Sequence, residues 1–113
     1  MRTQPIAQID VEKEMMRLVW ELESKTEEFE KLAVDSAQKE SALKAEWAKM
    51  YLTTAGTIRD REAQADNACK HLFADHKVAE ALVKSCRESL LFLRTSIDAL
   101  RSLNANVRYQ TND

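Results

Sequence analysis

Apolar residues recur every three or four positions along most of this chain, which is the spacing of one face of an α-helix. The pattern is clearest from about residue 58 to residue 103. There, two rows of residues, each repeating every seven positions, alternate to form the seam of a coiled coil. One row contains Ala65, Leu72, Ala79, Cys86, Leu93, Leu100 and Val107, and the other contains Cys69, His76, Val83, Leu90, Ile97 and Asn104.

The segment from residue 10 to residue 55 has a weaker repeat of the same length. Asp10 is a plausible N-cap for it, and a possible capping box at Ser24 and Glu27 leaves open whether the helix is continuous or bends there. One apolar ladder contains Met15, Leu22, Phe29, Leu43 and Met50, with Ser36 as a polar member. The companion ladder contains Val19, Ala33 and Trp47, with Thr26 and Glu40 as polar members.

A single glycine separates the two helical segments. Gly56 suits the end of a helix, and Thr57 with Asp60 forms a start signal resembling a capping box. Two long helices joined by a short turn form an antiparallel hairpin. We therefore predict an all-α, coiled-coil-like helical hairpin over residues 10–104 with its turn near residue 56. Residues 1–9 are predicted to be a flexible arm. Residues 105–113 are predicted to be a tail that loses helical character and is partly ordered if Val107 and Tyr109 find a partner.

Composition supports this fold class and excludes others. One glycine and one proline in 113 residues cannot supply the turns of a β-sandwich, a barrel or a doubly wound sheet. The chain has no apolar run long enough to span a membrane and no signal peptide, so we expect a cytoplasmic protein. The two cysteines lie too far apart on one helix to form a disulfide, and buried, reduced thiols are expected.

The second half of the hairpin is apolar on more than one side. Two helices cannot cover all of this surface, and a small domain gains little stability from its core alone. We therefore predict a homo-oligomer. Its interface is predicted to contain Leu82, Leu90, Leu91, Phe92, Ile97, Leu100 and Leu103.

Charge is distributed unevenly. The first 35 residues hold nine acids and five bases, although the whole chain has a net charge of −2. Beside the seam, bases repeat every seven residues. These rows contain Lys70, Lys77 and Lys84, and Arg87, Arg94, Arg101 and Arg108.

Two interpretations of these rows remain open. Arginines beside a seam commonly pair with acids of a neighbouring helix, here Glu21, Glu23, Glu27, Glu28 or Glu30. Alternatively, the rows bind phosphates while aromatic rings stack on bases. Among the aromatic residues, Trp47 fits the core, Tyr109 lies near the end of the chain, and Tyr51, near Lys44 and Lys49, is the better candidate for stacking.

Nothing in the sequence indicates catalysis or a cofactor. There is no glycine-rich phosphate loop and no zinc or calcium motif, and a hairpin offers no deep pocket. His71 and Asp75 are four residues apart, but Cys69 and His76 lie on the seam, so four ligands do not converge on a metal. We predict a protein that is not an enzyme and has no metal or cofactor. His76 is expected to be a hydrogen-bonded core histidine.

Two segments carry a family resemblance. The run Ser41–Trp47, followed by Tyr51 and Gly56, resembles the VALKARLDYYSG stretch of the UvsY-type recombination mediators of T-even phages. The run Leu90–Arg101, continuing to Ser102, is similar to the ALDAIKSR segment of that family, and residues 99–108 also resemble the ends of many short phage proteins.

The resemblance implies a small, helical, phage-encoded oligomer. Such a mediator binds single-stranded DNA and helps a recombinase displace a single-strand-binding protein. Lys44 corresponds to a DNA-contacting base, but Glu46 replaces the family's second base. This difference shifts the expected DNA site to Lys49 and to the row of Arg87, Arg94 and Arg101. Two alternatives are a protein-interaction module, such as a phage inhibitor of a host defence or enzyme, and a virion assembly or scaffold protein.

Overall fold

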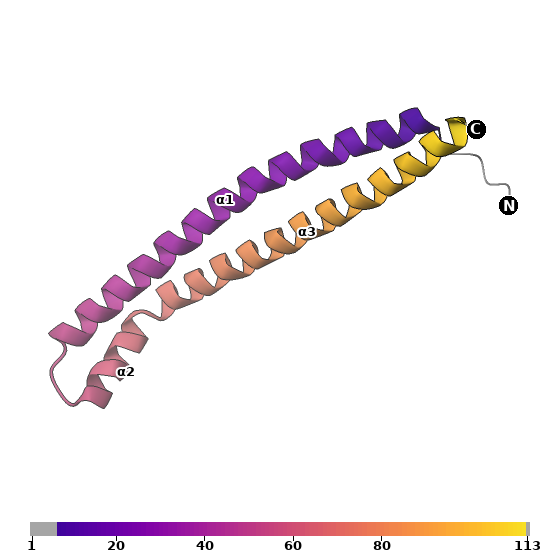
Figure 1. Cartoon of the computed structure of the whole chain (residues 1–113). Helices are drawn as coiled ribbons and strands as arrows, with labels where there is room; N and C mark the ends of the chain where they lie inside the picture. The colour runs from indigo at the N-terminus through magenta and orange to yellow at the C-terminus, as the bar shows by residue number, and fades with distance from the viewer. Residues whose placement is uncertain (1–6, 113) are drawn as a thin grey trace. The chain divides into compact units, whose positions relative to one another are not determined.

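The protein folds as a helical hairpin, as the sequence predicts. The computed structural model describes residues 7–112, which form three α-helices: α1 (Gln8–Thr53), α2 (Ile58–Ala68) and α3 (Lys70–Asn112) (Figure 1). Contacts divide the chain into two units. Unit 1 joins the start of α1, up to Glu28, to α3 from Cys86 onward, and unit 2 consists of residues 29–85. Within each unit the segment of α1 runs antiparallel to that of α3.

Helix α1 is continuous, so the capping signal at Ser24 produces no break. The helix begins at Gln8, and the backbone N–H groups of Asp10 and Val11 donate to the carbonyl of Ala7 at 3.0 and 3.3 Å. The prediction of Asp10 as the N-cap is therefore wrong, because Asp10 lies within the first turn. Of the predicted arm, residues 8 and 9 belong to this helix, whereas residues 1–6 lie outside the described residues.

The turn between α1 and α2 uses the expected local chemistry. The hydroxyls of Thr53 and Thr54 donate to the carbonyls of Lys49 and Met50 at 2.8 and 2.6 Å, which satisfies acceptors at the end of α1. Gly56 has a φ of +124°, a backbone conformation that residues other than glycine rarely adopt. Thr57 then caps α2, in the predicted capping box with Asp60.

This capping box gives a direct test of the hairpin turn. Replacing Thr57 by alanine is expected to lower the free energy of unfolding by about 0.5–2 kcal/mol, because the backbone N–H of Asp60 loses its hydroxyl acceptor. Urea unfolding followed by circular dichroism measures the loss. Thr57→Ser is the matched control and should retain most of the stability; equal losses in both variants would contradict the capping role.

The second helical segment is interrupted once, at Cys69, where the sequence predicts a continuous helix from about residue 58 to residue 103. Cys69 has a φ of −99° and a ψ of 6°, outside the helical range, although its N–H still donates to the carbonyl of Ala65 at 3.0 Å. Neither glycine nor proline marks this position. The break lies three residues after Asp66, whose carboxylate accepts a hydrogen bond from the indole N–H of Trp47 at 2.8 Å.

The carboxyl-terminal segment is helical, and the prediction of a tail without helical character after Asn104 is wrong. Helix α3 continues to Asn112. Val107 is buried on the seam, and the neighbouring Arg108 forms an ion pair with Glu12 of α1 at 3.7 Å. The ion pair joins the last turns of α3 to the start of α1.

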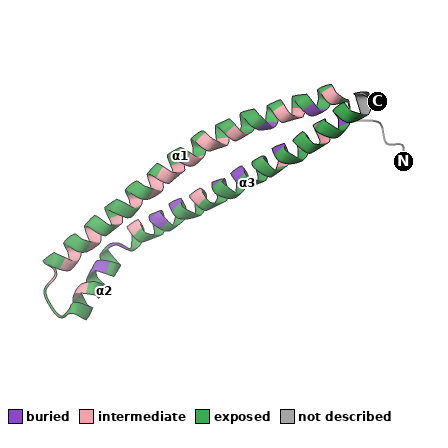
Figure 2. Ribbon diagram, viewed as in Figure 1, coloured by how far each residue is buried: buried purple, intermediate pink, exposed green. Residues whose placement is uncertain are grey.

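The seam predicted for residues 65–107 is confirmed, because every member of both rows is buried or half-buried (Figure 2). In α1 the ladder from Met15 to Met50 is also partly buried throughout. Of the predicted companion ladder, Thr26, Ala33 and Trp47 are half-buried, whereas Val19 and Glu40 are exposed. A row one residue earlier also faces inward: Val11 and Leu18 are buried, and Lys25, Leu32, Lys39 and Glu46 are half-buried.

The two units differ in what they bury. Unit 1 has a cluster of Leu18, Leu93 and Ile97, against which Leu22 and Leu100 pack. The fully buried positions of unit 2 hold smaller apolar groups, together with one histidine. They are Ala65, Cys69, His76 and Ala79. The cluster of large buried apolar residues therefore lies in unit 1.

Candidate nucleic-acid interface

The arginine row of unit 1 lies on α3, beside the buried seam. Its four members repeat every seven residues, so neighbours are spaced by about 10 Å along the helix axis. They are Arg87, Arg94, Arg101 and Arg108, and all four are exposed. Residues 86–112 contain only two acids, Glu88 and Asp98, so this segment carries a net positive charge.

Two members of the arginine row form ion pairs with acids other than those that the sequence offers as partners. Arg101 pairs with Asp98 on its own helix at 3.5 Å, and Arg108 pairs with Glu12 at 3.7 Å. Exposed pairs of this kind contribute at most about 1 kcal/mol, so a phosphate can replace the carboxylate at little cost. Arg94 is exposed and forms no ion pair with the residues that the structure describes.

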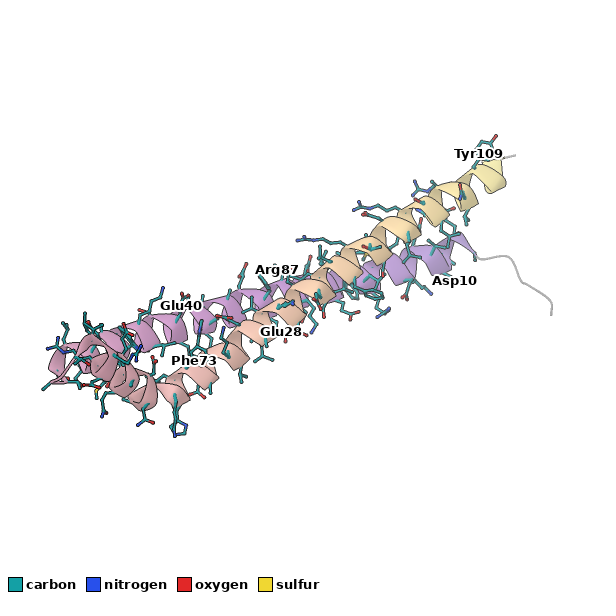
Figure 3. The ribbon with its side chains drawn as sticks, turned by 90° about the horizontal axis from the view of Figure 1, so that it is seen from below. Asp10, Glu28, Glu40, Phe73, Arg87 and Tyr109 are labelled. Carbon is teal, nitrogen blue, oxygen red and sulfur yellow. The ribbon has the colours of Figure 1, made fainter. Side chains whose placement is uncertain are left out.

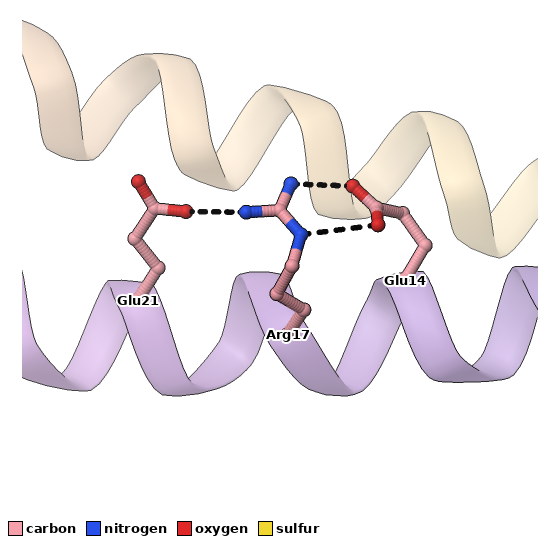
Figure 4. A network of polar contacts seen from close by, with 3 residues as sticks. All are labelled: Glu14, Arg17 and Glu21. Carbon is pink, nitrogen blue, oxygen red and sulfur yellow. Dashed lines mark hydrogen bonds and ion pairs between the residues drawn. The ribbon is translucent and has the colours of Figure 1, made fainter.

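Two of the expected acidic partners have other partners on α1. Arg17 donates to Glu14 at 3.0 Å and to Glu21 at 3.1 Å, so one guanidinium joins two carboxylates (Figure 4). The hydrogen bond from Arg17 lowers the pKa of Glu14, and the same bond raises the pKa of Arg17. Glu28 accepts from Lys25 at 3.0 Å, and this hydrogen bond raises the pKa of Lys25.

Unit 2 carries the lysine row, also on α3. Lys70, Lys77 and Lys84 are exposed, and Phe73 lies between the first two of them. The Lys77 ammonium is 5.4 Å from the centre of the Phe73 ring, a cation–π contact, and 3.6 Å from the Glu80 carboxylate. Phe73 is not among the residues predicted from the sequence to bind DNA. Its position three residues after Lys70 and four before Lys77 is the signal that would have indicated it.

The residues of α1 that were predicted to bind DNA differ in the contacts that they make within the chain. Lys44 is exposed and pairs with Glu40 at 2.9 Å, which lowers the pKa of Glu40 mainly through the hydrogen bond. Lys49 is exposed. Tyr51 stacks on Trp47, with ring centres 5.4 Å apart, and Arg61 lies 5.9 Å from its ring centre. Tyr51 is therefore half-buried in an aromatic stack, a less open surface than Phe73 offers.

A cleft of about 350 Å³ lies at the junction of α2 and α3 in unit 2. Trp47 and Phe73 form aromatic walls, and Asp66 and Lys70 are polar members of its lining. Leu43 and Cys69 complete the lining. Burial raises the pKa of the Cys69 thiol, and the charges of Glu46 and Asp66 raise it further, so Cys69 is a neutral, apolar part of the wall. Both cysteines are buried and free, as expected.

His76 is the buried polar residue of the seam, as expected. Its Nε2 atom lies 3.1 Å from the Glu80 carboxylate. Protonation of His76 would therefore create a short ion pair within α3. In the described part of the chain, no group of three or more histidine, cysteine or acidic side chains is arranged to hold a metal ion.

The predicted oligomer interface is divided between buried and exposed residues. Ile97 and Leu100 pack in the core cluster of unit 1, and Leu90 is buried as well, so these three stabilise the chain's own fold. Leu103 is half-buried. Leu82, Leu91 and Phe92 are exposed. Of the predicted interface residues on α3, Leu82, Leu91 and Phe92 are therefore the ones open to a partner.

A second exposed apolar surface was missed. Ile9, Met16 and Trp20 lie at helical spacing on the outside of α1 and line a shallow groove with Glu12, Lys13 and Arg17. Large apolar side chains in such a contiguous exposed stripe are typical of surfaces that bind a partner. No helix in residues 7–112 has the length and apolar content that crossing a membrane requires.

Comparisons of the chain with protein-family models, with curated proteins and with solved structures found no match. The resemblance to the UvsY-type mediators stays a prediction that rests on the residues quoted for it.

Proposed function

We propose that this chain is a phage-type recombination mediator, a small helical homo-oligomer that binds single-stranded DNA through the basic rows of α3. The observation that carries the proposal is the exposed arginine row of unit 1, whose members repeat every seven residues along α3. Cations at regular spacing neutralise a phosphate backbone without selecting a base sequence, as a mediator requires.

Single strands differ from duplexes in offering unstacked bases. Proteins that bind them without sequence preference combine a cationic track with aromatic side chains. Two exposed aromatic residues of α3 meet this requirement: Phe73 lies within the lysine row, and Tyr109 follows Arg108 (Figure 3). This combination favours single-stranded DNA over duplex DNA as the ligand.

Self-association is supported by complementary surfaces within unit 1. Residues 8–28 of α1 hold seven acids and three bases, whereas residues 86–112 of α3 hold four arginines and two acids. Each segment also exposes large apolar residues, such as Trp20 on α1 and Phe92 on α3. The acidic segment of one copy can therefore pair with the basic segment of another, and the exposed apolar residues of the two copies can cover each other. An oligomer would also strengthen DNA binding by avidity.

The second candidate is a protein-interaction module that does not bind DNA. The observation that favours it is the apolar stripe of Ile9, Met16 and Trp20 on the acidic part of α1, which suits a basic protein surface with an apolar centre. In the mediator proposal, the same stripe would face a second copy, a recombinase or a single-strand-binding protein.

The experiment that tests the proposal is a titration of a fluorescent 25-nucleotide single strand with the purified protein, at several salt concentrations. We expect binding at low salt, and a fall in log K with log salt whose slope is about −0.7 for each phosphate neutralised. Sedimentation of the same samples should give a mass above that of one chain. Absence of binding at low salt would overturn the mediator proposal in favour of the interaction module.

A further inference from the structure

We propose that the cleft between Trp47 and Phe73 in unit 2 is a stacking site for one nucleobase of the bound single strand. This inference deepens the function proposed above and rests on it. It assigns one base to the cleft of unit 2, in addition to the phosphates that the arginine row of unit 1 binds.

The first support is the exposure of Phe73. Phe73 is 53% exposed, and the neighbouring members of the lysine row, Lys70 and Lys77, are charged. Lys77 lies at the ring with its ammonium 5.4 Å from the centre. A half-exposed aromatic ring beside two lysines provides a π-face for a base and cations for the adjoining phosphates, the two elements of a single-strand site.

The second support is the shape and lining of the cleft beside that ring. Its volume of about 350 Å³ lies at the lower end of the range for small-ligand sites, about 300–1,000 Å³, which suits a group of the size of a base. Leu43, Trp47 and the neutral thiol of Cys69 give it apolar walls. A flat, uncharged heterocycle can therefore replace water there without leaving a buried charge unpaired.

The third support is the polar groups of the lining. Asp66 lies in the lining with Oδ1 accepting the indole N–H of Trp47 at 2.8 Å, which fixes both groups. Its carboxylate is an acceptor for N–H groups on a base edge. Lys70 also belongs to the lining, where its ammonium can pair with the phosphate of the same nucleotide.

The test compares two 25-nucleotide strands of equal charge, one of cytosine nucleotides and one abasic throughout. Phe73→Ala is expected to weaken binding of the cytosine strand by about five- to a hundredfold, the usual effect of losing one stacked base, and to leave binding of the abasic strand unchanged. Phe73→Tyr, which keeps an aromatic ring, and Val78→Ala, an exposed residue of α3 outside the cleft, are the controls. Both should bind the cytosine strand like the unchanged protein.

A second measurement locates the base. The indole N–H resonance of Trp47, assigned by its loss in Trp47→Phe, should shift when the cytosine strand is added and stay in place with the abasic strand. Equal binding of the cytosine strand by Phe73→Ala and the unchanged protein, with an unmoved Trp47 resonance, would overturn the stacking site and leave the DNA-binding proposal standing. Failure of both strands to bind would overturn both. Saturation by free cytidine monophosphate at the affinity of the strand would instead assign the cleft to a free nucleotide.

Discussion

Replacing both Arg94 and Arg101 by glutamate is expected to weaken the binding of a single-stranded oligonucleotide by at least about a hundredfold at low salt. The double substitution removes two cations from the centre of the arginine row and adds two anions. The slope of log K against log salt should become shallower by about 1.4, which corresponds to two phosphate contacts on a single strand.

These two positions are chosen because their loss leaves the fold intact. Arg101 has only an exposed partner on its own helix, Asp98 at 3.5 Å, whereas Arg108 reaches across to Glu12 of α1. Circular dichroism should therefore give the same helix content for the variant and the unchanged protein. The matched control is the double variant Lys31→Glu and Arg59→Glu, which has the same net charge but alters exposed residues away from the rows. Affinities within threefold of each other in the two double variants would contradict a specific role for the row.

The seam of α3 was predictable because its residue types agree with its spacing. From Ala65 to Val107 the inward positions are nearly all apolar, and the structure buries them fully or in part. The inward row of α1 that runs from Val11 to Glu46 was not predictable in the same way, because Lys25, Lys39 and Glu46 belong to it. Long charged side chains can cover apolar surface with their stems while their charges stay in water. In the sequence, such residues therefore look like those of a solvent-exposed face.

The missed features of α3 have a related cause. The break at Cys69 carries no glycine or proline, and it coincides with a tertiary feature, the hydrogen bond between Trp47 and Asp66. Phe73 has no place on the seam, and only its proximity to Lys77 and to the cleft reveals what it offers a ligand. The last turns of α3 are helical despite the polar composition around Val107, which is buried there.

Unit 1 contains the cluster of large buried apolar residues, and Leu93 belongs to it. Leu93 is 4% exposed and belongs to the cluster with Leu18 and Ile97. Replacing it by alanine is expected to lower the free energy of unfolding by about 2–5 kcal/mol, through lost burial and the cavity that remains. Small domains have about 5–15 kcal/mol in total, so this single change removes a large share.

The control for Leu93→Ala is Leu52→Ala, the same substitution at a residue of α1 that is 76% exposed. Leucine and alanine are both good helix formers, so helix propensity changes little at either site. We expect Leu52→Ala to alter stability by no more than about 0.5 kcal/mol, as surface substitutions usually do. Urea unfolding at 222 nm, with all proteins at one concentration, measures both, because self-association makes the midpoint depend on concentration. Losses for Leu93→Ala within 1 kcal/mol of those for Leu52→Ala would mean that the cluster of unit 1 does not hold the hairpin together.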